Sequence, residues 1–216
     1  MQLYHYAGNN PVEYIDPDGR QTEEWVVVSP GHGMDRPGSD PGTCHDGYKE
    51  ISYIYRLTSR LMPKLSNLGV NAINIKAPPY NAYTVSRKVK ESNRFGKNHK
   101  VALHISIHAD SLRGDGYVGI EIFYMTGRPI SKKIAEFFQK ELESAGFEAR
   151  IKSDNQTWVG RFGELWDTKA PATLIEIGTL GSAKGRKLLG NDKYMDKMAE
   201  ILSKAIEKFI KEKPNK

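Results

Sequence analysis

Short apolar runs alternate with longer stretches of mixed polarity along most of the chain. The short runs predict strands over residues 25–29, 70–75, 101–108, 119–125, 147–151 and 172–177. The longer stretches predict helices over residues 48–68, 85–98, 130–144 and 193–211. Strands that alternate with helices of this length indicate a single α/β domain, built on a mostly parallel twisted sheet of about six strands with helices on both faces.

Composition narrows the classes of partner. The 216 residues include 38% hydrophobic and 27% charged residues, and none of the apolar runs is long enough to span a bilayer. The net charge of +6 favours a polyanionic partner, which could be nucleic acid, anionic lipid, or a cell wall that carries carboxylates and phosphates. Nucleic acid is disfavoured, because no cluster of Lys and Arg is interleaved with aromatic residues. Cys44 is the only cysteine, which excludes intrachain disulfides, and we expect a monomer.

Candidate chemistry gathers where predicted strands end. His32 follows the first strand, His108 closes the third, and Glu176 lies near the end of the last, while Glu50 lies near the start of the first long helix. Ligands of open α/β sheets bind beyond the carboxyl ends of the strands. Two imidazoles and one carboxylate are a common catalytic zinc set, and a fourth, unligated carboxylate is needed to take a proton from water.

Each of these residues also has an ordinary explanation. A histidine at a strand end is usually structural, and Glu50 in a first helical turn suits the helix dipole. Glu176 is harder to explain, because a charge between Ile175 and Ile177 is costly unless it is paired or functional.

Four motifs in order carry a family resemblance. They are Val-Val-Val-Ser-Pro-Gly-His-Gly at 26–33, Lys-Glu at 49–50, Ser-Ile-His-Ala-Asp at 106–110, and Pro-Ala-Thr-Leu-Ile-Glu-Ile-Gly at 171–178. Together they resemble the zinc-dependent N-acetylmuramoyl-L-alanine amidases of the amidase 3 type. The resemblance runs from about residue 25 to 209 and includes Arg87 and Asn93, so a catalytic domain over 23–213 is expected.

The resemblance implies roles for individual residues. His32, Glu50 and His108 would bind one Zn²⁺, and Glu176 would be the catalytic acid and base. Arg87 would be a structural tie near the site. The substrate would be peptidoglycan, cut between N-acetylmuramic acid and L-alanine.

Some positions depart from the family pattern or stay open. Asp110 stands where asparagine is usual, which affects the shape of the pocket rather than its metal chemistry. Trp158, together with Phe162 and Trp166, would either stack on sugar rings or pack in the core. The short connection between 110 and 120 leaves no room for the plugging helix of some related amidases. We therefore expect a site that is open without an activator.

The first residues carry a second resemblance. Residues 3–20, with Asn-Asn-Pro and Asp-Pro-Asp-Gly, resemble the end of the RHS-repeat-associated core that precedes toxin domains. The interpretations are a loosely ordered leader over 1–22 without present function, or the remnant of an RHS toxin that attacks competitors and is matched by an immunity protein. No signal peptide is evident, so we expect action in the periplasm or cell wall after export by another route or within a larger protein.

Three rival functions remain at this point. A zinc peptidase acting on stem-peptide bonds would use the same chemistry. The same ligand set also suits iron in an oxygenase, although such enzymes usually present it inside a β-barrel. A non-catalytic wall-binding module would use the basic charge but leaves the cost of Glu176 unexplained.

Overall fold

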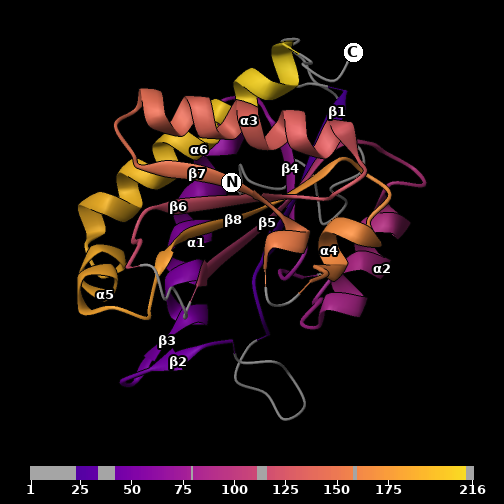
Figure 1. The fold of residues 1–216 in the computed structure, drawn as a ribbon. Coiled ribbons are helices and arrows are strands. Elements are labelled where there is room, and N and C mark those ends of the chain that lie inside the picture. Colours follow the sequence, from indigo (N-terminus) through magenta and orange to yellow (C-terminus); the bar gives the residue numbers. More distant parts are fainter. Residues whose placement is uncertain (1–22, 34–41, 79, 111–115, 158–159, 213–216) are drawn as a thin grey trace, which may run out of the picture.

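A mixed six-stranded sheet forms the centre of the computed structural model, which describes residues 23–33, 42–78, 80–110, 116–157 and 160–212 (Figure 1). The strand order is β4-β1-β5-β8-β6-β7. The strands are β1 Glu24–Pro30, β4 Asn71–Asn74, β5 Lys100–Asp110, β6 Ile120–Tyr124, β7 Ala149–Ser153 and β8 Ala172–Thr179. Only the β6–β8 pairing is antiparallel within this sheet. The predicted α/β fold is confirmed.

Helices cover both faces of the sheet. They are α1 Glu50–Asn67, α2 Val85–Phe95, α3 Pro129–Ser144, α4 Gly163–Trp166, α5 Ala183–Leu189 and α6 Asp192–Glu212. The sequence did not predict the short helices α4 and α5, nor the 3₁₀ turn Asp154–Gln156. Within the described residues, no helix combines the length and apolar character that a bilayer crossing needs.

Side-chain alternation along the strands separates the two faces. Helices α1, α3 and α6 pack on the larger core, where α1 buries Ile54, Leu57 and Leu61 at spacings of three and four. Each such side chain contributes roughly 1.5–3 kcal/mol when it is fully buried. Helices α2 and α4 lie together on the opposite face (Figure 1), over smaller clusters that include Phe95 and Leu165. One face is thus almost purely apolar, and the other has room for polar chemistry.

A small hairpin, which the sequence patterns did not predict, precedes α1. Strands β2 Cys44–His45 and β3 Tyr48–Lys49 pair antiparallel, and α1 begins only at Glu50 rather than at residue 48. The turn between them has positive φ at Asp46 (49°) and Gly47 (80°), as expected for an Asp-Gly hairpin. The hairpin delivers the chain to the start of α1 beside the carboxyl edge of the sheet.

Candidate metal centre

Three side chains from separate parts of the chain converge at the carboxyl edge of the sheet. His32 Nε2 lies 3.0 Å from Glu50 Oε2, and His108 Nδ1 lies 3.2 Å from both His32 Nε2 and Glu50 Oε1. Tetrahedral zinc with ligand bonds near 2.0 Å would hold its donors about 3.3 Å apart. Two nitrogens and one carboxylate at these separations therefore fit one zinc ion with an open fourth position.

Backbone geometry after β1 brings His32 into the triad. His32 has φ of 54°, in the left-handed region that histidine adopts more readily than most residues, at a cost on the order of 1 kcal/mol. Its neighbours must be small. A Cβ on Gly31 would lie 2.6 Å from His108 Nδ1, and a Cβ on Gly42 would lie 2.6 Å from the ring of His32. The glycines thus allow the two imidazoles to approach each other and Glu50.

Glu50 is fixed by the chain segments on either side of it. The Thr43 N–H donates to Oε2 at 3.2 Å, and the Ala109 N–H donates to Oε1 at 3.0 Å. The Glu50 N–H in turn donates to the Thr43 carbonyl at 2.9 Å, which starts α1 at this residue. The buried carboxylate is therefore oriented before any ion binds.

The protonation states suit metal binding. Burial alone would raise the pKa of Glu50, but hydrogen bonds and charge from His108 and His32 outweigh it and hold this pKa well below its ordinary value of 4.5. Burial lowers the pKa of His108 below 6.5, even though Glu50 acts in the other direction. A deprotonated carboxylate and a neutral imidazole are the forms that bind metal.

Glu176 reaches the same edge on the neighbouring strand. In the parallel pairing of β5 with β8, Glu176 lies directly opposite His108, so both side chains project from the same face about 5 Å apart in strand spacing. Glu176 is 9% exposed. The strand register therefore places Glu176 beside His108 at the carboxyl edge of the sheet.

A buried polar chain lies on this same face and was not predicted as a unit. Lys88 Nζ is 3.2 Å from Glu164 Oε1, Glu164 Oε2 is 3.2 Å from His104 Nε2, and His104 Nδ1 is 3.0 Å from Ser92 Oγ. Because a carboxylate only accepts, the Nε2–H of His104 donates to Glu164. The sequence signal for this polar chain was Lys88, which lies four residues before Ser92 and therefore on the same, inward face of α2.

Other predicted residues lie apart from the triad. Arg87 is exposed on α2, where its backbone N–H donates to Thr84 Oγ1, and among the described residues its guanidinium makes no contact with the triad. Lys88 has the inward position instead, because α2 turns that residue toward the sheet. Asp110 ends β5 at the carboxyl edge, and its carbonyl accepts from Leu180 N–H at 2.6 Å.

The aromatic residues before β8 were also candidates. Phe162 and Trp166 pack against the apolar cluster around Leu165, which favours the packing interpretation for these two. Trp158 lies outside the described residues. His45 lies on β2 beside Asp46 and outside the triad.

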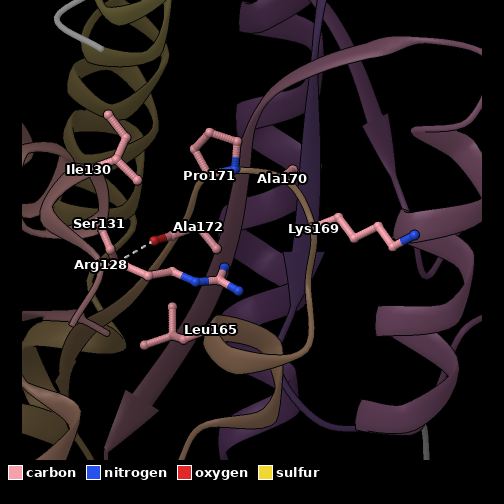
Figure 2. Close-up of a pocket in the computed structure, with 8 residues that line it drawn as sticks. All are labelled: Arg128, Ile130, Ser131, Leu165, Lys169, Ala170, Pro171 and Ala172. Carbon is pink, nitrogen blue, oxygen red and sulfur yellow. Dashed lines mark hydrogen bonds between the residues drawn. The ribbon is translucent and has the colours of Figure 1, made fainter. Parts of the chain in front are cut away.

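A hollow at the start of β8 is a different place. It measures about 210 Å³ and includes Arg128, Ser131, Lys169 and Ala172 among its lining residues (Figure 2). The Arg128 guanidinium donates to backbone carbonyls, and the Ser131 hydroxyl donates to the Ala172 carbonyl. This end of β8 is opposite to the one with Glu176, and the lining includes no acid or imidazole. The hollow therefore lacks the groups for amide hydrolysis.

Comparison with known proteins decides the family. The sequence profile of Amidase_3, described as N-acetylmuramoyl-L-alanine amidase, matches residues 26–208. The chain belongs to this amidase family. Among amidases with this description, the germination-specific N-acetylmuramoyl-L-alanine amidase of Bacillus subtilis (strain 168) is 27% identical over 201 residues, which cover 87% of this chain and 80% of that protein.

Solved amidase structures share the fold. The catalytic domain of CwlV from Bacillus (Paenibacillus) polymyxa var. colistinus superposes with a TM-score of 0.71 at 21% identity, covering 87% of this chain and 98% of that one. The N-acetylmuramoyl-L-alanine amidase from Clostridium difficile 630 gives a TM-score of 0.72 at 22% identity, covering 88% and 98%. The family and fold expected from the sequence motifs are thereby confirmed.

Proposed function

We propose that this chain is a zinc-dependent hydrolase of the amide bond between N-acetylmuramic acid and L-alanine in peptidoglycan. Family membership supports the choice of bond and substrate. The observation that carries the metal part is the convergence of His32, Glu50 and His108, whose donor atoms lie within 4.8 Å of one another. Their separations suit zinc, and their two-nitrogen, one-oxygen set leaves a position for substrate and water.

The chain's own residues then divide the work. His32, Glu50 and His108 would hold the ion, which would supply a water of lowered pKa and a Lewis acid for the lactyl carbonyl. Glu176, opposite His108 in the register, takes a proton from the attacking water. The same carboxyl delivers that proton to the L-alanine nitrogen, so that the nitrogen leaves as an amine.

Charge and context agree with a cell-wall substrate. The net charge of +6 favours approach to a wall that carries carboxylates and phosphates. We place the activity in the periplasm or cell wall. Residues 1–22 lie outside the described part of the chain, and their RHS-like sequence supports delivery as a toxin with a matching immunity protein. Failure of the chain to lyse susceptible cells, when it is expressed in them with a signal that directs it to the periplasm, would contradict the toxin role.

Metal analysis tests the central part of this proposal. Purified protein is stripped with a chelator, reloaded with zinc or iron, and assayed on purified peptidoglycan, with bound metal counted by mass spectrometry. We expect activity to return with one zinc per chain. His108→Ala should lose both metal and activity, whereas His45→Ala, a histidine on the nearby hairpin, should keep both. Activity that survives complete metal removal, or that returns with iron but not with zinc, would overturn the zinc assignment.

A further inference from the structure

Lys76 lies at the carboxyl end of β4, on the far side of β1 from Glu176. Its backbone is fixed in a turn, because its N–H donates to Asn74 Oδ1 at 3.0 Å and the next N–H, of Ala77, donates to the Asn74 carbonyl at 3.0 Å. Its half-buried side chain runs back over the end of β1, where Nζ donates to the Gly31 carbonyl at 3.2 Å. The ammonium is therefore held next to the residue that precedes His32.

The sheet order puts this ammonium in line with the site. Strands β4, β1, β5 and β8 are consecutive neighbours and parallel, and their carboxyl ends present Lys76, His32, His108 and Glu176 in that order. A substrate whose scissile bond lies between His32, His108 and Glu176 thus has Lys76 one strand, or about 5 Å, beyond His32.

The charge of Lys76 has no close counter-ion in the part of the chain that the structure describes. Among the described residues, no carboxylate lies within ion-pair distance of its Nζ, and the Gly31 carbonyl takes one of its three donors. Other lysines of low exposure differ, since the fully buried Lys88 pairs with Glu164 and the partly buried Lys152 pairs with Glu121. Burial, followed by the charge of Lys88, lowers the pKa of Lys76 to about 8, against the opposing effects of Glu164 and Glu50. Because burial disfavours the charged form of Lys76, an anionic ligand beside Nζ would stabilise that form and would itself be bound.

The stem peptide supplies an anion at a matching distance. Its second residue is a glutamate joined through the side-chain carboxyl, so its α-carboxylate stays free. Two residues of chain reach roughly 7 Å from the scissile carbonyl, which is enough to pass from His32 to the end of β4. On the other flank, the cations Arg150 and Lys152 are already salt-bridged to Glu121.

We propose that Lys76 is a specificity-determining residue that binds the free α-carboxylate of the second stem-peptide residue. This inference rests on the proposed amidase function. It gives the site a direction, with the peptide crossing β1 toward β4 and the glycan extending the other way. It also predicts that the enzyme distinguishes stems with a free carboxylate from stems in which the same group is an amide.

Two small substrates distinguish binding of the α-carboxylate by Lys76 from a purely structural role of Lys76 at the Gly31 carbonyl. One is N-acetylmuramoyl-L-alanyl-D-glutamate, with a free α-carboxylate, and the other is N-acetylmuramoyl-L-alanyl-D-isoglutamine, in which that carboxyl is an amide. Wild-type enzyme should prefer the acid by roughly 10-fold to 100-fold in kcat/KM, as expected for one charge-assisted hydrogen bond. Lys76→Met should abolish the preference by raising KM for the acid alone, and Lys76→Arg should retain most of it. Lys90→Met removes the same charge from the exposed side of α2 and should change neither substrate.

Each outcome decides between explanations. If Lys76→Met lowers activity on both substrates equally, Lys76 only supports the Gly31 carbonyl and the proposal is wrong. Equal use of acid and amide by the wild-type enzyme would also overturn it, while leaving the amidase function intact. Cleavage of neither compound, by enzyme that also fails on intact peptidoglycan, would overturn the proposed function and this inference with it.

Discussion

Replacement of Glu164 by glutamine should destabilise the protein by about 3–5 kcal/mol, because it leaves the Lys88 ammonium buried without its partner. The side chains of Lys88 and Glu164 are only 1% and 4% exposed, and their charged atoms are 3.2 Å apart. Because both side chains are almost fully buried, the expected loss lies in this range rather than below about 1 kcal/mol, as for an exposed pair.

Equilibrium urea unfolding at pH 7, followed by circular dichroism, measures this effect. The single variants Glu164→Gln and Lys88→Met should each unfold at much lower urea. The double variant should lose less than the sum of the two, with a coupling energy of about 2–3 kcal/mol. Glu136→Gln breaks the exposed ion pair with Lys132 on α3 and should cost at most about 0.5 kcal/mol. Strictly additive losses, or a Glu164→Gln variant as stable as wild type, would refute the argument.

Three further predictions concern pH, loop geometry and proton transfer. The charge of Lys88 and the hydrogen bond from His104 hold the folded-state pKa of Glu164 below 4.5 despite burial, so the unfolded chain binds more protons in acid. Stability should therefore fall as pH drops below about 4.5, less steeply in Glu164→Gln, and urea titrations from pH 6 to pH 3 check this slope. Gly42→Ala, at φ of 72°, should weaken zinc binding at least about 10-fold by displacing His32, as competition with a chelating dye would report. Glu176→Gln should keep its zinc and lose at least about 100-fold in kcat, and a fully active variant would exclude Glu176 from proton transfer.

Much of the site could be predicted because its residues follow strong local signals. Apolar runs located the ends of β1, β5 and β8, and parallel strands necessarily bring those ends to one edge. His32, His108 and Glu176 were therefore expected to meet once the strands were located. The sequence placed Glu50 only near the start of a helix. The hydrogen bonds that its carboxylate accepts from the Thr43 and Ala109 N–H groups depend on tertiary structure and could not be predicted.

The features that the sequence did not predict were missed for physical reasons. The hairpin around Asp46 was missed because two-residue strands show no alternation, although the Asp-Gly pair is a hairpin signal. The buried Lys88–Glu164 pair was missed because its members are distant in sequence and each reads as a surface charge. Arg87 was expected near the site and Lys88 was not. Neighbouring residues of a helix point in directions about 100° apart, so Arg87 is exposed while Lys88 is buried.

The identity of the released product tests the central claim most directly. Purified sacculi are digested with zinc-loaded enzyme, with and without chelator, and the soluble products are analysed by tandem mass spectrometry. The account predicts intact stem peptides that begin with a free L-alanine amine, absent when chelator is present. Products cut within the stem, with L-alanine still attached to N-acetylmuramic acid, would contradict it and identify a peptidase instead.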